Sequence, residues 1–305
     1  MRLVFAGTPQ LAADTLQLLL DSGRHQVVAV LTRPDAAKGR SSQLIPSPVA
    51  ALAAERGIEV LKPVRPSDPA LTQRLAELAV DCVPVVAYGG LIPGALLTAV
   101  PKGWVNLHFS LLPRWRGAAP VQRAILAGDE LSGVTIFELV AELDAGPVLA
   151  TAPYSFGPDE TAGEALAGLT ALGGQLLLET LDAREAGTAV ARPQPEEGVT
   201  SAPKLTPAEA RLDWQRPADE LARVVRANNP SPIAWTTLNG ERFRVLRATA
   251  APGQAEPGAV EAERKSVRVG TGQGLLELVE VQPAGKRVLA AADWARGLRQ
   301  AVRFE

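Results

Sequence analysis

The first half of the chain alternates between two periods of apolar residues, and this alternation constrains the fold more than any other feature. Short apolar runs at Arg2–Ala6, Val27–Thr32 and Val83–Tyr88 have the composition of buried strands. Between them, Leu11–Leu20 and Asp68–Leu78 carry apolar residues at helical spacing. Strands that alternate with helices are typical of βαβ units. We therefore expect an α/β domain built on a mostly parallel sheet.

The same domain is expected to continue to residue 188. Val105–His108 and Val134–Leu139 are further short strands, each bounded by turn residues, and Thr161–Ala183 is predicted to be a long closing helix. The predicted N-terminal domain, residues 1–188, thus has a Rossmann-like architecture.

After this helix the composition changes. Residues 189–206 contain several prolines and charges without apolar periodicity, which is typical of a linker. Beyond it, Ala218–Ala227 is predicted to be a helix. Four short β runs then follow between glycines and prolines: Ala234–Leu238, Phe243–Ala248, Ser266–Gly270 and Leu275–Val281. We expect residues 207–305 to form a small antiparallel β-barrel of the OB-like kind.

Charge divides in the same way, although the net charge of −2 hides the division. Residues 201–305 contain 16 Lys and Arg against 12 Asp and Glu, so the preceding residues are acidic overall. Of those 16 cations 13 are arginine, which pairs well with phosphate. Candidate phosphate contacts are Arg244, Arg247, Lys286 and Arg287. Ordinary solubilising charges explain the same pattern equally well.

Cysteine content and hydropathy limit the remaining classes. Cys82 is the only cysteine, which rules out an intramolecular disulfide and a cysteine-based zinc site, and no metal is expected. Cys82 to Val100 is uncharged for about the length of a membrane span. Its two prolines and three glycines favour a buried strand, a turn and a short helix instead. With no signal peptide evident, we expect a cytoplasmic protein that does not enter membranes.

The turn after the first strand, Ala6-Gly7-Thr8-Pro9, stands where a dinucleotide fingerprint would lie. It lacks the second and third glycines of that motif, and no phosphate-binding P-loop occurs in the chain. A tight strand-to-helix turn is favoured over a substrate contact, although loops at this edge of open sheets do bind ligands.

Three polar residues form the strongest catalytic candidate. Asn106 and His108 are two apart at the end of a strand, so their side chains leave the same face. By itself this pair is as consistent with a structural histidine as with catalysis. Asp144 follows Val134–Leu139, and parallel strands would bring it to the same edge of the sheet. An amide, an imidazole and a carboxylate together can stabilise an oxyanion and move a proton in an acyl-type transfer.

No serine or cysteine has an evident activating base. Ser110 has no second histidine nearby in sequence, and Cys82 lies in an apolar run. Direct attack by the substrate's own nucleophile is therefore favoured over a covalent intermediate.

The segment from Asn106 to Pro120, with Ser-Leu-Leu-Pro followed by Arg-Trp-Arg-Gly-Ala-Ala-Pro, resembles the signature of the folate-dependent formyltransferases. Further segments resemble that family in the same order along the chain: Phe5–Pro9, Pro46–Val49, Val86–Gly89, Lys204–Trp214 and Gln282–Lys286. Phe109 and Gly90 depart from the usual pattern of the family.

The resemblance implies transfer of a formyl group from 10-formyltetrahydrofolate to the amino group of methionyl initiator tRNA. We expect the protein to be a monomer. The resemblance implies catalytic roles for Asn106, His108 and Asp144. The folate site it implies consists of Ser110, Leu111, Leu112, Pro113, Val86, Tyr88 and Gly89. It also implies a basic loop that reaches the tRNA acceptor stem, with contacts from Arg33, Lys38 and Arg40.

Two alternatives stay open at this point. Members of the family use other acceptors, so an amino sugar or another small amine is an alternative substrate. A non-catalytic RNA-binding protein is the alternative from a different class. The complete Asn106, His108 and Asp144 set speaks against the latter. The Lys204–Trp214 segment and the basic C-terminal part speak against a purine intermediate as acceptor, since the family member that uses one resembles only the catalytic domain.

Overall fold

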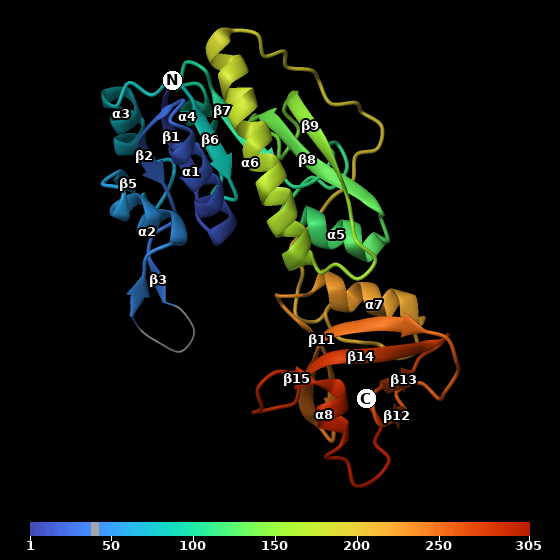
Figure 1. Ribbon diagram of the computed structural model, residues 1–305. Helices are drawn as coiled ribbons and strands as arrows, with labels where there is room; N and C mark the ends of the chain where they lie inside the picture. The colour runs from blue at the N-terminus through green and yellow to red at the C-terminus, as the bar shows by residue number, and fades with distance from the viewer. Residues whose placement is uncertain (38–42) are drawn as a thin grey trace. The chain divides into compact units, whose positions relative to one another are not determined.

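The computed structural model describes residues 1–37 and 43–305, which form two compact units that interleave along the chain (Figure 1). The first unit consists of Met1–Gly117, Ser132–Tyr154 and Leu166–Ser201. The second consists of Ala118–Leu131, Ser155–Ala165 and Ala202–Glu305. The expected ranges 1–188, 189–206 and 207–305 instead follow chain order, and this division into domains stays a prediction.

A seven-stranded sheet organises the first unit. Its strands, from edge to edge, are β5 (Glu59–Leu61), β2 (Gln26–Leu31), β1 (Arg2–Gly7), β6 (Val83–Val86), β7 (Trp104–His108), β8 (Leu131–Glu138) and β9 (Val148–Ser155). The pairings from β5 across to β7 are all parallel, which confirms the mostly parallel, Rossmann-like sheet. Strand order reverses at β1, and ligands of such sheets bind at the carboxyl ends of the strands beside that reversal.

The pairing of β7 with β8 departs from this pattern. These two strands are antiparallel, with Val105 opposite Glu138 and His108 opposite Thr135. The expectation that parallel strands carry Asp144 to the edge of His108 is therefore wrong for this pair. The chain leaves β8 at the edge where β7 begins, so the loop 139–147 has to turn back to reach His108.

Five helices accompany the described part of this sheet, and local signals mark the start of two of them. They are α1 (Gln10–Ser22), α2 (Pro48–Glu55), α3 (Pro69–Glu77), α4 (Gly94–Leu97) and α6 (Ala162–Ala186), whose first residues belong to the second unit. The Ser47 and Asp68 side chains cap α2 and α3 by accepting from backbone N–H groups in the first turn, and each helix then starts with proline. Two-residue strands β3 (Ala36–Ala37) and β4 (Leu44–Ile45) pair with each other.

The second unit contains an antiparallel sheet, drawn mainly in orange and red in Figure 1. Its strands in spatial order are β10 (Ala234–Leu238), β11 (Glu241–Ala251), β14 (Leu275–Gln282), β13 (Val267–Gly270) and β12 (Val260–Ala262), with β15 (Leu289–Ala290) beside β14. Its helices are α5 (Pro120–Ala127), α7 (Ala218–Ala227) and α8 (Ala291–Ala295). The antiparallel C-terminal sheet is confirmed, and its closure into a barrel stays a prediction.

Aromatic side chains form the centre of this second core. Phe243 on β11 lies with its ring centroid 4.7 Å from that of Trp294 and 4.9 Å from that of Phe304. Trp214 stacks on Phe304 at 5.5 Å. Each ring of this size buries a large apolar area, so the penultimate residue of the chain contributes directly to stability.

Helix α5 joins this core from the N-terminal half of the sequence. It packs on α7, and Leu126 of α5 contacts the apolar cluster that includes Leu221 and Phe243. The segment that follows the Arg-Trp-Arg-Gly motif thus belongs to the second unit rather than to the sheet that precedes it.

The start of α6 supports a prediction on pH. Glu164 accepts from the backbone N–H and the hydroxyl of Thr161 and forms an ion pair with Arg247, and these contacts lower the pKa of Glu164 to about 2. A depressed carboxylate pKa stabilises the fold above the unfolded pKa, and this contribution is lost as pH falls toward 2.

We expect Glu164→Gln to lower the melting temperature at pH 6 but to have almost no effect at pH 2. The Glu164 side chain is about half exposed, so screening limits the loss to about 1 kcal/mol or less. Thermal unfolding of both proteins at the two pH values measures the difference, and an equal difference at both values contradicts it.

No helix within residues 1–37 and 43–305 is long and apolar enough to cross a membrane.

Candidate active site

His108 ends strand β7 inside the first unit and is only 5% exposed. Its Nε2 lies 2.8 Å from the carbonyl oxygen of Trp115, seven residues further on. A carbonyl oxygen only accepts, so Nε2 carries a hydrogen and Nδ1 of the neutral ring has a free lone pair. The ring also meets Phe137 edge-on, with centroids 6.3 Å apart. These contacts fix both the orientation and the tautomer of the imidazole.

Asp144 lies on the other side of the ring. Its Oδ2 is 3.8 Å from His108 Nδ1 and accepts from the backbone N–H of Gly117 at 2.7 Å. The loop between β8 and β9 brings it there, and Asp144 itself has a φ of 50°, in the left-handed region. A non-glycine residue in that region costs about 1–2 kcal/mol, so the surrounding contacts have to hold it.

Burial controls the ionisation of this pair. Desolvation lowers the pKa of His108, while the Asp144 charge and the Trp115 carbonyl act in the opposite direction. We infer that His108 is neutral near pH 7. Proton uptake at Nδ1 would create an imidazolium facing the Asp144 carboxylate, so the pair can hold a proton during a reaction.

Asn106 is the third predicted member. It lies two residues before His108 on β7, opposite Phe137 of β8, and is half-buried. The alternation of strand side chains puts its amide on the same face as the imidazole. The structure therefore brings all three candidate residues to one region, although their catalytic roles stay predictions.

The expected folate residues lie at the carboxyl edge of the sheet, on the last residue of β6 and on the loops that follow β7 and β6. Ser110 is fully buried, and its hydroxyl donates to the Arg114 carbonyl at 2.6 Å. The Thr135 hydroxyl on β8 donates to the Ser110 carbonyl and accepts from the Leu112 N–H. Ser110 thus shapes the loop that carries Leu111, Leu112 and Pro113. Thr135 was missed because nothing in its local sequence marks it.

The second of these loops follows β6, where Val86 is buried. Tyr88 is buried with its phenol beside Arg33, and burial raises the pKa of that phenol. Gly89 has a φ of 76° and is exposed, a conformation that favours glycine. A Cβ on Gly90 would lie 2.6 Å from the Tyr88 ring, which explains why glycine stands at this unusual position.

The turn after β1 is structural in this region. A Cβ on Gly7 would lie 2.7 Å from the Ala12 Cβ and 2.9 Å from the Val86 carbonyl oxygen. The Thr8 hydroxyl donates to the Tyr88 carbonyl at 2.8 Å, which ties the loops after β1 and β6 together. These contacts agree with the favoured prediction of a tight strand-to-helix turn.

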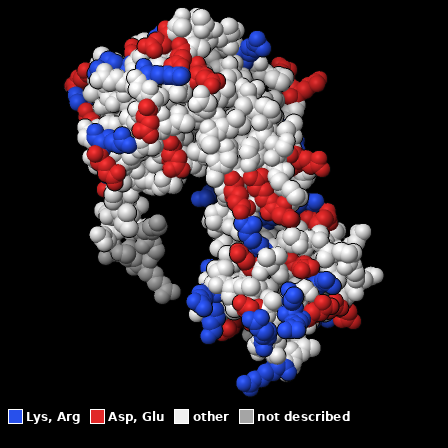
Figure 2. Space-filling model, viewed as in Figure 1, with Lys and Arg blue, Asp and Glu red and all other residues white. Residues whose placement is uncertain are grey.

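The basic residues predicted to contact tRNA differ in their hydrogen-bond and ion-pair partners. On β11, Arg244 donates to the Gln282 side chain, which in turn donates to the carbonyl of Lys286. Lys286 and Arg287 are exposed in the turn between β14 and β15. Arg247 instead forms ion pairs with Glu164 and Glu280. Figure 2 shows basic and acidic side chains interleaved over this unit.

Of the predicted basic loop, Lys38 and Arg40 lie outside the described residues. Arg33 is described, and its backbone N–H lies 3.4 Å from the Thr8 hydroxyl. Arg33 is therefore next to the expected folate loop rather than on a separate surface.

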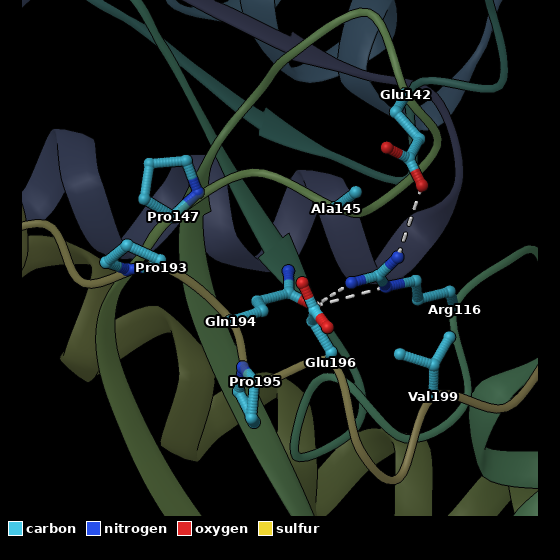
Figure 3. Close-up of a pocket in the computed structure, with 9 residues that line it drawn as sticks. All are labelled: Arg116, Glu142, Ala145, Pro147, Pro193, Gln194, Pro195, Glu196 and Val199. Carbon is cyan, nitrogen blue, oxygen red and sulfur yellow. Dashed lines mark hydrogen bonds and ion pairs between the residues drawn. The ribbon is translucent and has the colours of Figure 1, made fainter.

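The expected linker contributes directly to this region, which the sequence did not indicate. Residues 192–200 follow the edge of the first unit, where Thr200 accepts from the backbone N–H groups of Trp115 and Arg116. Gln194 donates to the Asp144 carbonyl, and Figure 3 shows its amide facing the Arg116 guanidinium. A cavity of about 550 Å³ opens here. It is lined by Arg116, Glu142, Ala145, Pro147, Pro193, Gln194, Pro195, Glu196 and Val199.

A buried imidazole–carboxylate pair at the carboxyl edge of a mostly parallel sheet defines a candidate transferase of the acyl-transfer kind. The chain belongs to the formyl transferase family: the model of the formyl transferase domain matches residues 1–181, and that of the formyl transferase C-terminal domain matches residues 204–299.

Known proteins resemble the chain along nearly its whole length. A methionyl-tRNA formyltransferase of Streptomyces coelicolor is 52% identical over 98% of this chain and 97% of that protein. A solved N-formyltransferase from Helicobacter canadensis, in complex with folinic acid and dTDP-3-aminofucose, is 15% identical with a TM-score of 0.70 over 92% of this chain and 98% of that one. HypX from Aquifex aeolicus is 21% identical with a TM-score of 0.69; the match covers 96% of this chain and 48% of HypX. The two structural matches establish the fold.

Proposed function

We propose that the protein transfers a formyl group from 10-formyltetrahydrofolate to the amino group of methionyl initiator tRNA. The observation that carries the proposal is the buried pair of His108 and Asp144, 3.8 Å apart, in a chain about half identical to a methionyl-tRNA formyltransferase along its length. In this proposal the enzyme is a monomer that acts in the cytoplasm, where charged tRNA is used.

The loops beside this pair suit a folate. The loop after β6 combines an open glycine turn at Gly89 with Leu91, which is 79% exposed, at the edge where such sheets bind ligands. An exposed apolar side chain at a polar loop suits a flat ring with polar edges. We assign Val86, Tyr88, Gly89 and the Ser110–Pro113 loop to the donor site.

The proposed reaction uses no enzyme-bound intermediate. The neutral methionyl amine attacks the formyl carbon, a new C–N bond forms and the carbonyl oxygen becomes an oxyanion. The Asn106 amide stabilises this oxyanion, together with the Nδ1 hydrogen that His108 takes from the attacking nitrogen. Asp144 stabilises the imidazolium and helps to remove a proton from the attacking nitrogen. The oxyanion then reforms the carbonyl as the bond from the formyl carbon to N10 breaks, N10 takes up the proton held by His108, and tetrahydrofolate leaves.

Formylation of methionyl initiator tRNA with 10-formyltetrahydrofolate as donor tests the proposal. We expect transfer to the initiator tRNA and much slower transfer to charged elongator methionine tRNA. Transfer to a nucleotide-linked amino sugar without transfer to tRNA would contradict the acceptor but keep the donor. Binding of tRNA without any formyl transfer would contradict the enzymatic function.

The pairing of basic residues in the second unit predicts unequal effects on tRNA use. Lys286→Ala combined with Arg287→Ala should raise KM for tRNA severalfold and flatten its salt dependence, by about one unit of slope for each phosphate that the variant no longer binds. Arg247→Ala should have a smaller effect, because two carboxylates already neutralise that guanidinium. Initial rates at several salt concentrations measure both, and equal effects would contradict the assignment.

A further inference from the structure

Residues 192–194 cross the end of the hairpin that carries the loop of Asp144. Arg192 pairs with Val148 of β9 through two backbone hydrogen bonds, of 2.7 and 2.8 Å. This bridge fixes the position of the chain two residues before Gln194. The Gln194 side chain therefore starts from a defined point and is half-buried rather than free in solvent.

The amide of Gln194 uses all of its hydrogen-bonding groups, and Figure 3 shows its contact with Arg116. Its Nε2 donates to the carbonyl oxygens of Asp144 and Gly146, both at 2.8 Å. Its Oε1 accepts from Nε and Nη2 of Arg116, at 3.1 and 2.8 Å. An amide has two N–H hydrogens and two acceptor lone pairs, so every hydrogen-bonding group of this side chain is used.

These bonds hold a part of the site whose backbone conformation is unfavourable. Asp144 has a left-handed backbone, and its carboxylate is held only by the N–H of Gly117 among the hydrogen bonds of the described residues. Gln194 binds the Asp144 main chain, while Arg116, which Gln194 also binds, directly precedes Gly117. One side chain thus joins the two segments whose relative position sets where the carboxylate lies.

We propose that Gln194 is a positioning residue, which holds the Asp144 loop against the Arg116–Gly117 segment so that the carboxylate faces His108. It touches no reacting group and acts only through Asp144. The inference rests on the proposed roles of His108 and Asp144, but the arrangement that it explains is independent of which amine is formylated.

Two substitutions separate the parts of this contact. Gln194→Met keeps the length of the side chain and removes all four hydrogen bonds. Gln194→Glu keeps acceptors for Arg116 and loses both donors to the loop carbonyls. Gln175→Met on α6 is the control, because Gln175 is exposed and its amide donates to Glu179 one turn away. We expect both Gln194 variants to lower kcat by 10- to 100-fold, with KM for donor and tRNA within twofold, and the control to match the wild type.

A second readout needs no substrate. The chain has two histidines, His108 and His25, and His25 lies far from this loop in sequence and pairs with Asp182. A histidine NMR titration therefore follows His108 with His25 as an internal reference for folding. In Gln194→Met the His108 midpoint should move to lower pH, because the Asp144 charge that opposes the effect of burial has moved away.

The results for the Gln194 variants test its positioning role independently of which acceptor the enzyme uses. A wild-type kcat and an unchanged His108 titration in Gln194→Met overturn it, whichever acceptor the enzyme uses. A loss of rate in Gln194→Met but not in Gln194→Glu also overturns it, because the bond to Arg116 alone would then matter. Loss of the folded His25 signal in both variants counts against it, since Gln194 would then serve general stability. If only Gln194→Met unfolds, the kcat of Gln194→Glu tests the proposal, and a wild-type value overturns it.

Discussion

Asp144→Asn should lower kcat/KM for formyl transfer by about 10²- to 10⁴-fold while the fold stays intact. The asparagine carbonyl still accepts from the N–H of Gly117, so the loop keeps its anchor. The substitution removes the negative charge 3.8 Å from His108 Nδ1. In the proposed reaction this charge stabilises the protonated ring and assists removal of the amine proton. Single-turnover rates with saturating donor measure the effect on the chemical step itself.

The charge change also predicts a shift in pH dependence. The Asp144 carboxylate raises the pKa of His108 against the effect of burial, so its removal should move the His108 titration to lower pH. Asp21→Asn on α1 is a matched control, because this carboxylate is well exposed and remote in sequence from the site. A rate within twofold of the wild type in Asp144→Asn would exclude Asp144 from the reaction.

Gly146→Ala should reduce both stability and rate, because this position has no room for a side chain. A Cβ there would lie 1.7 Å from the backbone oxygen of Glu138 and 2.9 Å from its carbonyl carbon, so the chain between β8 and β9 would have to open. Forcing atoms into a packed site costs about 1–3 kcal/mol. A displacement of about 1 Å at the carboxylate two residues earlier would lower kcat by about 10²-fold.

Gly94→Ala provides the comparison for this substitution. A Cβ on Gly94 would meet no atom within 4 Å. Its melting temperature and kcat should therefore stay close to those of the wild type. Thermal unfolding and initial rates of the two variants test the difference. If Gly146→Ala keeps both values, the loop adapts to a side chain and its geometry is not fixed by Glu138.

Periodic segments of the fold could be predicted from the sequence. The predicted helix Ala218–Ala227 and strand Ala234–Leu238 have the bounds of α7 and β10, because apolar spacing and turn residues are local signals. The direction of β8 could not be predicted in this way. A strand has the same alternation of side chains whether its neighbour is parallel or antiparallel. Only the pairing with β7 in the folded structure shows the direction of β8.

The residues of the candidate site also differ in whether a local sequence pattern predicts their position. Asn106 and His108 are neighbours on one strand, so their common face follows from the two-residue repeat. Gln194 lies 50 residues after Asp144 in a stretch rich in proline, and no periodicity indicates that it folds back onto the loop. The hydrogen bonds that orient the carboxylate are long-range in sequence, and a composition typical of a linker concealed them.

The assignment of α5 to the second unit determines how the proposed catalysis and the proposed tRNA binding can be separated by protein engineering. Catalysis is proposed for the first unit and tRNA contacts for the second, yet α5 is encoded before residues 132–154 and 166–201 of the first unit. A fragment that begins at residue 207 would expose the face of α7 that α5 covers. Transplanting the tRNA-binding half into another enzyme therefore requires residues 118–131 to travel with it, from a distant part of the gene.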